Sequence, residues 1–300
     1  MSNQNFNSLP KPHTTYVNII KSLLPIGDHE KAQQAVLPEA TYTVTQLVID
    51  QDNLADYRKI CGFDNNSYVP PTYFAVLSQT LQMNMMVKEP FPFAMLGLIH
   101  VKNSVTQYRY IKDTAAFKMA VSFANLREHE RGQQFDFVTQ VFEADELLWE
   151  GTSTYLSRQK KKTAPKPATS TTANLPANKP ELDDNDMHQF WEVPEDIGRR
   201  YAFVSGDFNL IHLHPLSAKA FGFPKAIAHG MWTKAKCLGA VGDLPEKFTC
   251  DVSFKLPIFL PSEVEFIAKF DNRDEKIDFG VYDVKTPKAH LLGEIIEITF

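Results

Sequence analysis

The sequence predicts an α+β protein of 300 residues that is built from two similar halves. In each half, an apolar helix candidate precedes a run of alternating segments typical of antiparallel strands. Residues 159–185 lie between the halves and are rich in proline, threonine, alanine and lysine, which is the composition of a flexible linker. A tyrosine and a glycine also recur at the same spacing, within residues 57–62 and 201–206.

The first half begins with one strand and two helices. Residues 42–49 alternate and are rich in β-branched side chains, which predicts a strand, and residues 51–61 have a short helical pattern. Residues 69–87 open with prolines that suit a helix start and then carry few charges, so we expect a buried central helix. Long alternating segments with tight turns then predict a curved antiparallel sheet. These segments are 94–105, 115–130, 133–144 and 146–158.

The second half repeats this plan. Helical patterns cover residues 194–203 and 226–241, and the second of these helices has one apolar face. Four strand-like runs follow, at 248–256, 263–270, 276–282 and 290–299. We therefore expect an N-terminal domain at 1–158 and a C-terminal domain at 186–300.

Composition excludes several classes of function. The net charge of −5 gives no electrostatic attraction for nucleic acid or for an anionic membrane surface. No uninterrupted apolar run reaches 18 residues, so we expect a soluble, cytoplasmic protein. Three widely spaced cysteines argue against a disulfide framework and fit a reducing compartment. Zinc and calcium ligand spacings are absent from the sequence, so we expect no metal and no cofactor.

Chemistry concentrates in one short stretch that holds Asp207, Asn209, His212 and His214. A helix is expected to end at Gly206, because Gly-Asp-x-Asn supplies residues that turn the chain and bond to their own backbone. The acid and the imidazole would then lie on a loop, where both could reach a single water molecule. Such a pair can add water to, or remove it from, a carbon–carbon double bond. The structural alternative is a helix-capping Asp207 and a surface His212.

The pattern Tyr-x-x-x-Ser-Gly-Asp-x-Asn-x-Ile-His, followed after a short helix by Ile-Ala-His-Gly-Met, covers residues 201–231. It resembles the (R)-specific enoyl-thioester hydratase signature of the MaoC-like dehydratase family. The resemblance implies a hot-dog fold, in which an antiparallel sheet wraps a long helix. With two such halves in one chain, it implies the double hot-dog form, a pseudo-dimer within a single chain.

The resemblance also assigns roles to residues. Asp207 and His212 would be the catalytic pair, with Asn209 and Ser205 as supporting hydrogen-bonding residues. The backbone N–H of Gly230 would donate to the thioester carbonyl, although a glycine needed only for close packing explains the residue equally well.

Two departures from the family pattern affect the same loop. Leu210 stands where the family usually has proline, which loosens the loop without removing chemistry. His214 stands where Asp or Asn is usual, which leaves the cap of the next helix in doubt. In the first half no histidine follows Gly62 at the matching distance. The resemblance implies that this half is not catalytic and accommodates the acyl chain, with the helix at 69–87 as its lining or simply as core.

Two further residues have open roles. Lys225 is a candidate for binding a phosphate of coenzyme A or of phosphopantetheine, and a solvated surface lysine is the alternative. His229 either caps the helix that begins near Gly230 or bonds to the catalytic loop.

The leading hypothesis is a hydro-lyase that interconverts trans-2-enoyl and (R)-3-hydroxyacyl thioesters in fatty-acid metabolism. The substrate would be carried as a thioester of CoA or of acyl carrier protein, and the sequence does not choose between them. A thioesterase and a non-catalytic acyl-CoA binding protein are the alternatives on the same fold. An acyl carrier protein and a second copy of the chain are the candidate protein partners.

Overall fold

The structure is a computed structural model that describes residues 2–10, 35–95, 97–158, 179–271, 273 and 275–299. The chain divides into two compact units that are not continuous in sequence. The first unit takes residues 1–48, 74–103 and 115–172. The second unit takes residues 49–73, 104–114 and 173–300. Parts of the N-terminal half therefore belong to the unit that holds the C-terminal half.

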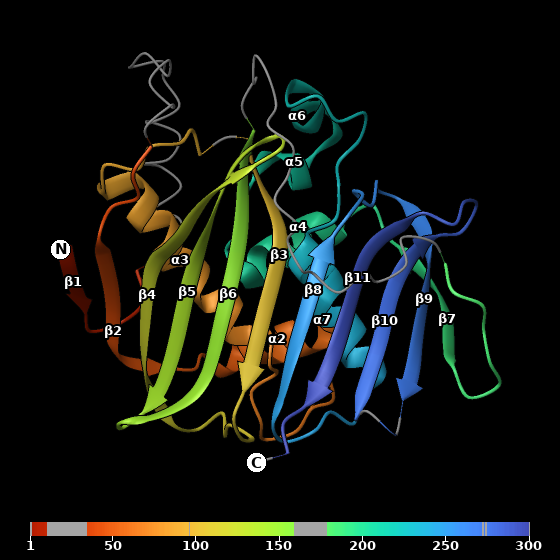
Figure 1. Cartoon of the computed structure of the whole chain (residues 1–300), viewed down its shortest axis with the longest axis horizontal. Helices are drawn as coiled ribbons and strands as arrows, with labels where there is room; N and C mark the ends of the chain where they lie inside the picture. Colours follow the sequence, from red (N-terminus) through yellow and green to blue (C-terminus); the bar gives the residue numbers. More distant parts are fainter. Residues whose placement is uncertain are drawn as a thin grey trace. The chain divides into compact units, whose positions relative to one another are not determined.

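The first unit is a sheet with one long helix against it (Figure 1). Its strands follow the order β1-β2-β4-β5-β6 and then the first part of β3. β1 is parallel to β2, and the pairs from β2 to β6 are antiparallel. The elements are β1 (Ser2–Phe6), β2 (Ala40–Val48), α3 (Tyr73–Lys88), β3 (Leu98–Gln107), β4 (Ala116–His129), β5 (Gly132–Glu143) and β6 (Glu146–Arg158).

Aromatic side chains join α3 to this sheet. Phe74 is fully buried, and its ring lies 5.3 Å from that of Phe117 on β4 and 5.7 Å from that of Trp149 on β6. Aromatic pairs at these separations add to the hydrophobic stabilisation of the core. Phe74 therefore packs in the core of the first unit. The sequence left two roles open for this helix, core packing and lining of the acyl chain, and this contact belongs to the first.

The second unit also has a sheet and a central helix. The order of its strands is the last part of β3, then β8-β11-β10-β9-β7. The elements are α2 (Gln51–Cys61), β7 (Met187–Val193), α4 (Ile197–Ser205), α5 (Leu210–Leu213), α6 (Pro215–Ala220), α7 (Gly230–Val241), β8 (Phe248–Phe254), β9 (Ser262–Asp271), β10 (Lys276–Asp283) and β11 (Ala289–Glu297).

Helix α7 lies against β10 and β11 on one side and is crossed by α2 on the other (Figure 1). The crossing is close, because a Cβ at Gly239 would lie 2.8 Å from the backbone oxygen of Cys61. The indole N–H of Trp232 donates to the carbonyl of Ile60 at 3.2 Å. These contacts fix α2, from the N-terminal half, over the helix whose first residue is Gly230.

The predicted strands and helices are confirmed apart from four differences, the first of which is that residues 210–213, expected to be loop, form α5. Two strands, β1 and β7, were not predicted; β1 is a run of polar residues, and β7 lies where the linker was expected to meet a helix. Helix α7 begins at Gly230 rather than at residue 226. The reason is that Ile227 bridges to Phe259 and the N–H of Ala228 donates to the carbonyl of Ile258, so this segment is extended.

Residues 159–178 of the expected linker lie outside the described residues, but its last part is described and is held in place. The ammonium of Lys179 forms an ion pair with the buried carboxylate of Glu265 on β9. Lys269, also on β9, is 3.0 Å from Asp183. Residues 179–186 therefore follow the outer strands of the second unit. Among the described residues, no helix has the length and apolar character needed to cross a membrane.

Candidate active site

The end of α4 sets the position of the candidate acid. Gly206 ends the helix in the left-handed region at φ 71°, as the sequence predicts, and its N–H donates to the carbonyl of Ala202 at 2.9 Å. The hydroxyl of Ser205 donates to the carbonyl of Tyr201 at 2.8 Å and accepts from the N–H of Asp207 at 3.2 Å. Ser205 thus ties Asp207 to the last turn of α4.

Asn209, not Asp207, caps the next helix. The side-chain oxygen of Asn209 accepts from the N–H of Ile211 at 3.4 Å at the start of α5. The carboxylate of Asp207 accepts from the N–H of Asn209 at 3.2 Å, which holds the turn closed. The supporting roles of Asn209 and Ser205 are therefore local: they shape the turn that presents the carboxylate.

His212 lies on α5 and is only 9% exposed, so it is not the open-loop histidine that the sequence suggests. Its Nδ1 lies 2.8 Å from the carbonyl oxygen of Ile227. A carbonyl can only accept, so Nδ1 carries the proton and Nε2 is the bare, basic nitrogen. The extended segment before α7 therefore selects the tautomer of His212.

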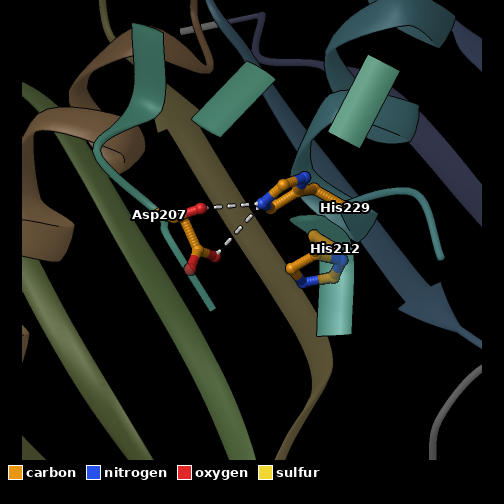
Figure 2. A group of neighbouring side chains, drawn as sticks. All are labelled: Asp207, His212 and His229. Carbon is orange, nitrogen blue, oxygen red and sulfur yellow. Dashed lines mark hydrogen bonds and ion pairs between the residues drawn. The ribbon is translucent and has the colours of Figure 1, made fainter. Parts of the chain in front are cut away.

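His229 completes the group, and of the two roles that the sequence left open for it the structure shows the bond to the loop that holds Asp207. It occupies the N-cap position of α7 but makes no side-chain cap bond. Its Nε2 lies 3.0 Å from the backbone oxygen of Asp207 and 3.8 Å from the Oδ2 atom of that residue. Figure 2 shows its ring over that of His212, at a centroid distance of 3.7 Å and an angle of 26°. The histidine in Ile-Ala-His-Gly-Met was the available signal.

Burial sets the protonation state of both imidazoles. It lowers the pKa of His212 below its usual value, and the nearby carboxylate of Asp207 opposes part of this effect. Burial and the neighbouring His212 ring lower the pKa of His229 to about 3. Both rings are therefore neutral near pH 7. Burial also raises the pKa of Tyr201, whose ring lies 5.0 Å from that of His229, so that the phenol stays neutral too.

Asp207, His212 and His229 each offer a ligand atom, and these atoms lie within 4.8 Å of one another. Their directions do not suit a metal ion. A metal lies in the plane of each imidazole that binds it, along the nitrogen lone pair. Two rings that are stacked at 26° share no nearby point that lies in both planes. The arrangement favours proton transfer over metal binding, and the absence of a metal stays a prediction.

The remaining predicted residues lie around this group. A Cβ at Gly230 would come within 2.9 Å of the Phe254 ring, so a larger residue there would displace that ring, whatever the role of Gly230 in binding. His214 does cap α6, because its Nδ1 accepts from the N–H of Leu216 at 3.2 Å, which resolves the doubt about this position. Lys225 is exposed, and its phosphate-binding role stays a prediction.

The first-half counterpart of α4 lies in the same unit. α2 ends at Gly62, which has φ 80° and donates its N–H to the carbonyl of Arg58, as Gly206 does at the end of α4. The rings of Tyr57 and Tyr201, at matching positions of the two helices, are 6.2 Å apart. The repeated spacing thus marks two helix ends of one kind, and the second is followed by Asp207 and His212, whose polar side-chain atoms lie within 4.8 Å of each other.

Comparison with known proteins agrees with this geometry. The family model described as "MaoC like domain" matches residues 158–290. The protein 3-hydroxyacyl-thioester dehydratase X of Mycobacterium tuberculosis is 39% identical over 229 residues, which are 75% of this chain and 79% of that protein. The (R)-specific enoyl-CoA hydratase of Aeromonas caviae is 39% identical over 69 residues, which are 21% of this chain and 52% of that protein.

Solved structures give the same result for the fold. A crystal structure of HtdX from Mycobacterium tuberculosis aligns with a TM-score of 0.73 at 33% identity and covers 85% of this chain and 99% of that chain. Another protein of that organism, described as having a double hot-dog fold, aligns with a TM-score of 0.51 at 10% identity over 89% of this chain and 95% of that one. The α+β double hot-dog class predicted from the sequence is confirmed.

Proposed function

Since the chain belongs to the MaoC-like dehydratase family, we propose that it is a hydro-lyase that interconverts trans-2-enoyl and (R)-3-hydroxyacyl thioesters. One observation carries the proposal: the carboxylate of Asp207 and an imidazole nitrogen of His212 lie within 4.8 Å of each other at the end of α4. The two relatives are named as a 3-hydroxyacyl-thioester dehydratase and an (R)-specific enoyl-CoA hydratase, which supports the same reaction for this chain.

The protonation states suit the hydration direction. Asp207 offers carboxylate oxygens and His212 offers a bare Nε2, so both groups enter the reaction as proton acceptors for a bound water. The water oxygen bonds to the β-carbon as the double bond opens. The pair takes one proton from the water and returns one proton to the α-carbon, so both groups end in their starting state. Dehydration follows the same steps in reverse.

Gly230 is the proposed donor to the thioester carbonyl. As the first residue of α7 it presents a backbone N–H at a helix N-terminus, and the side chain of its neighbour His229 does not cap that helix. One well-placed donor to a developing oxyanion contributes about 3 kcal/mol to transition-state stabilisation. The Phe254 ring, which lies against Gly230, keeps the position free of a side chain.

The carrier of the acyl group is part of the proposal. CoA and acyl carrier protein both present the substrate as a phosphopantetheine thioester, and exposed Lys225 is the proposed contact for a phosphate. A second copy of the chain is a further proposed partner. A cytoplasmic location is also proposed, and it fits three buried cysteines that form no disulfide. A thioesterase and a non-catalytic acyl-CoA binding protein are the rival functions.

The test is an assay with a short and a long trans-2-enoyl-CoA, repeated with the same acyl groups on acyl carrier protein, with chiral analysis of the product. We expect loss of the enoyl absorbance and an (R)-3-hydroxyacyl product. Asp207→Asn and His212→Gln should each lower kcat by about 10³-fold or more, because each removes a proton acceptor. Release of free thiol would instead show a thioesterase, and tight binding without turnover would show a binding protein. Thermal melts of both variants check that they fold.

A further inference from the structure

His229 is a buried polar group of the second unit that the proposed reaction does not use. It is 3% exposed and contacts three residues of the site at once. Its Nε2 reaches the backbone oxygen of Asp207, and its ring faces those of His212 and Tyr201. These contacts come from different elements: α4 and the turn after it, α5, and the N-terminus of α7.

The hydrogen bond to Asp207 settles the tautomer of His229. Because the backbone oxygen of Asp207 can only accept, Nε2 of His229 carries the proton and Nδ1 is bare. No described residue bonds to Nδ1, although it is buried. This ring therefore points its single N–H at a backbone carbonyl, and it has no proton to give to a substrate. Its place is beside the reacting groups rather than among them.

A ring in this place restricts both candidate catalytic groups. Two contacts oppose rotation of the His212 side chain. The carbonyl of Ile227 accepts from Nδ1 at one edge of the ring, and the His229 ring covers one face at a centroid distance of 3.7 Å. The side-chain N–H of His229 donates to the backbone oxygen of Asp207, the first residue after Gly206. This bond holds the backbone at the point where α4 ends and the turn begins. A displacement of about 1 Å in such a pair costs on the order of 10²-fold in rate.

We propose that His229 is a positioning residue that holds Asp207 through its N–H and His212 through its ring, and that it takes part in no proton transfer itself. This inference rests on the proposed function, because it names what aligns that function's two proton acceptors. The neutral state of His229 is a requirement: a charged ring stacked on His212 would lower the basicity of Nε2 of His212 and so weaken it as a proton acceptor.

Two substitutions separate the two contacts. His229→Gln keeps an N–H donor at the position of Nε2 and removes the ring, whereas His229→Phe keeps a flat ring on His212 and removes the donor. We expect each to lower kcat by about 10–100-fold with KM little changed, because substrate contacts stay in place. His129→Gln, at the end of β4, is the matched control and should retain wild-type kinetics.

The pH profile distinguishes positioning from a general loss of stability. Activity needs the bare Nε2 of His212, so it falls as the pH drops through the lowered pKa of His212. Among the described residues, the titratable groups that face His212 and His229 are Asp207 and Tyr201, and the ring of Tyr57 lies 6.2 Å from that of Tyr201. Removing the ring admits water to His212, so in His229→Gln the acidic limb of kcat/KM should move to higher pH. In His229→Phe, where the face of His212 stays covered, the limb should stay where it is in the wild type.

A readout independent of activity is the tautomer of His212, observed in ¹⁵N-histidine NMR spectra. The wild type should show a single tautomer with the proton on Nδ1, and His229→Gln should show a mixture. Wild-type kinetics and an unmoved limb in both variants, or loss of folding in both, would overturn the positioning role. An inactive wild-type enzyme with a single His212 tautomer would instead refute the proposed reaction and leave the positioning of His212 standing.

Discussion

Gly198 on α4 offers a test of how strictly the position of His212 is set. A Cβ built at Gly198 would overlap the backbone oxygen of His212 and lie 3.0 Å from its carbonyl carbon. The obstacle is backbone rather than the end of a flexible side chain, so it cannot turn aside. Ordinary van der Waals contact requires α4 and α5 to separate by about 1 Å or more.

Two effects of Gly198→Ala act in opposite directions. Alanine favours a helix over glycine by about 1 kcal/mol, so helix propensity alone predicts a more stable protein. The overlap with His212 costs about 1–3 kcal/mol, as overpacking of a close contact usually does. We expect the overlap to prevail, with a lower melting temperature and a kcat reduced on the order of 10²-fold, which is about 2.7 kcal/mol in activation free energy.

The measurement combines enoyl-CoA hydration kinetics with thermal melting. Arg200→Ala is the control on the same helix, because Arg200 is exposed and its guanidinium lies 3.9 Å from the carboxylate of Asp196, too far for a strong ion pair. That variant should match the wild type in kcat. A Gly198→Ala protein with wild-type kcat and a raised melting temperature would refute the claim that α4 sets the position of α5.

Two predictions concern parts of the chain outside the site. Burial lowers the pKa of Lys234, whose ammonium donates to the carbonyl of Cys250 at 3.0 Å. Between the lowered pKa of the folded chain and about pH 10.4 the unfolded chain therefore binds more protons than the folded one, so within that window this residue makes stability rise with pH. The free energies of unfolding of the wild type and of Lys234→Met should be measured in urea at several pH values. The wild type should gain stability relative to the variant as the pH rises, and a difference that does not change with pH would contradict the prediction. Deletion of residues 161–176, which stops short of Lys179, should leave activity and melting temperature nearly unchanged because of the linker composition. A shortened protein that fails to fold would show that the deleted segment is needed for packing.

The helices and strands were largely predictable because their signals are local. Alternation and β-branched residues marked the strands, and Gly62 and Gly206 marked two helix ends, since both adopt the left-handed conformation that glycine favours. Exceptions arose where pairing overrode propensity. Residues 226–228 have a helical pattern, yet they are extended because Ile227 bridges to Phe259.

The sequence by itself singled out the residues that we propose carry the chemistry: Asp207 and His212 are five residues apart, and their polar side-chain atoms lie within 4.8 Å of each other. Only the tertiary structure decided their states. The tautomer of His212 depends on the carbonyl of Ile227, 15 residues away, and its burial depends on the His229 ring. The protonation state of a buried group depends on hydrogen bonds and desolvation by its neighbours in space. Sequence spacing does not specify which residues those neighbours are.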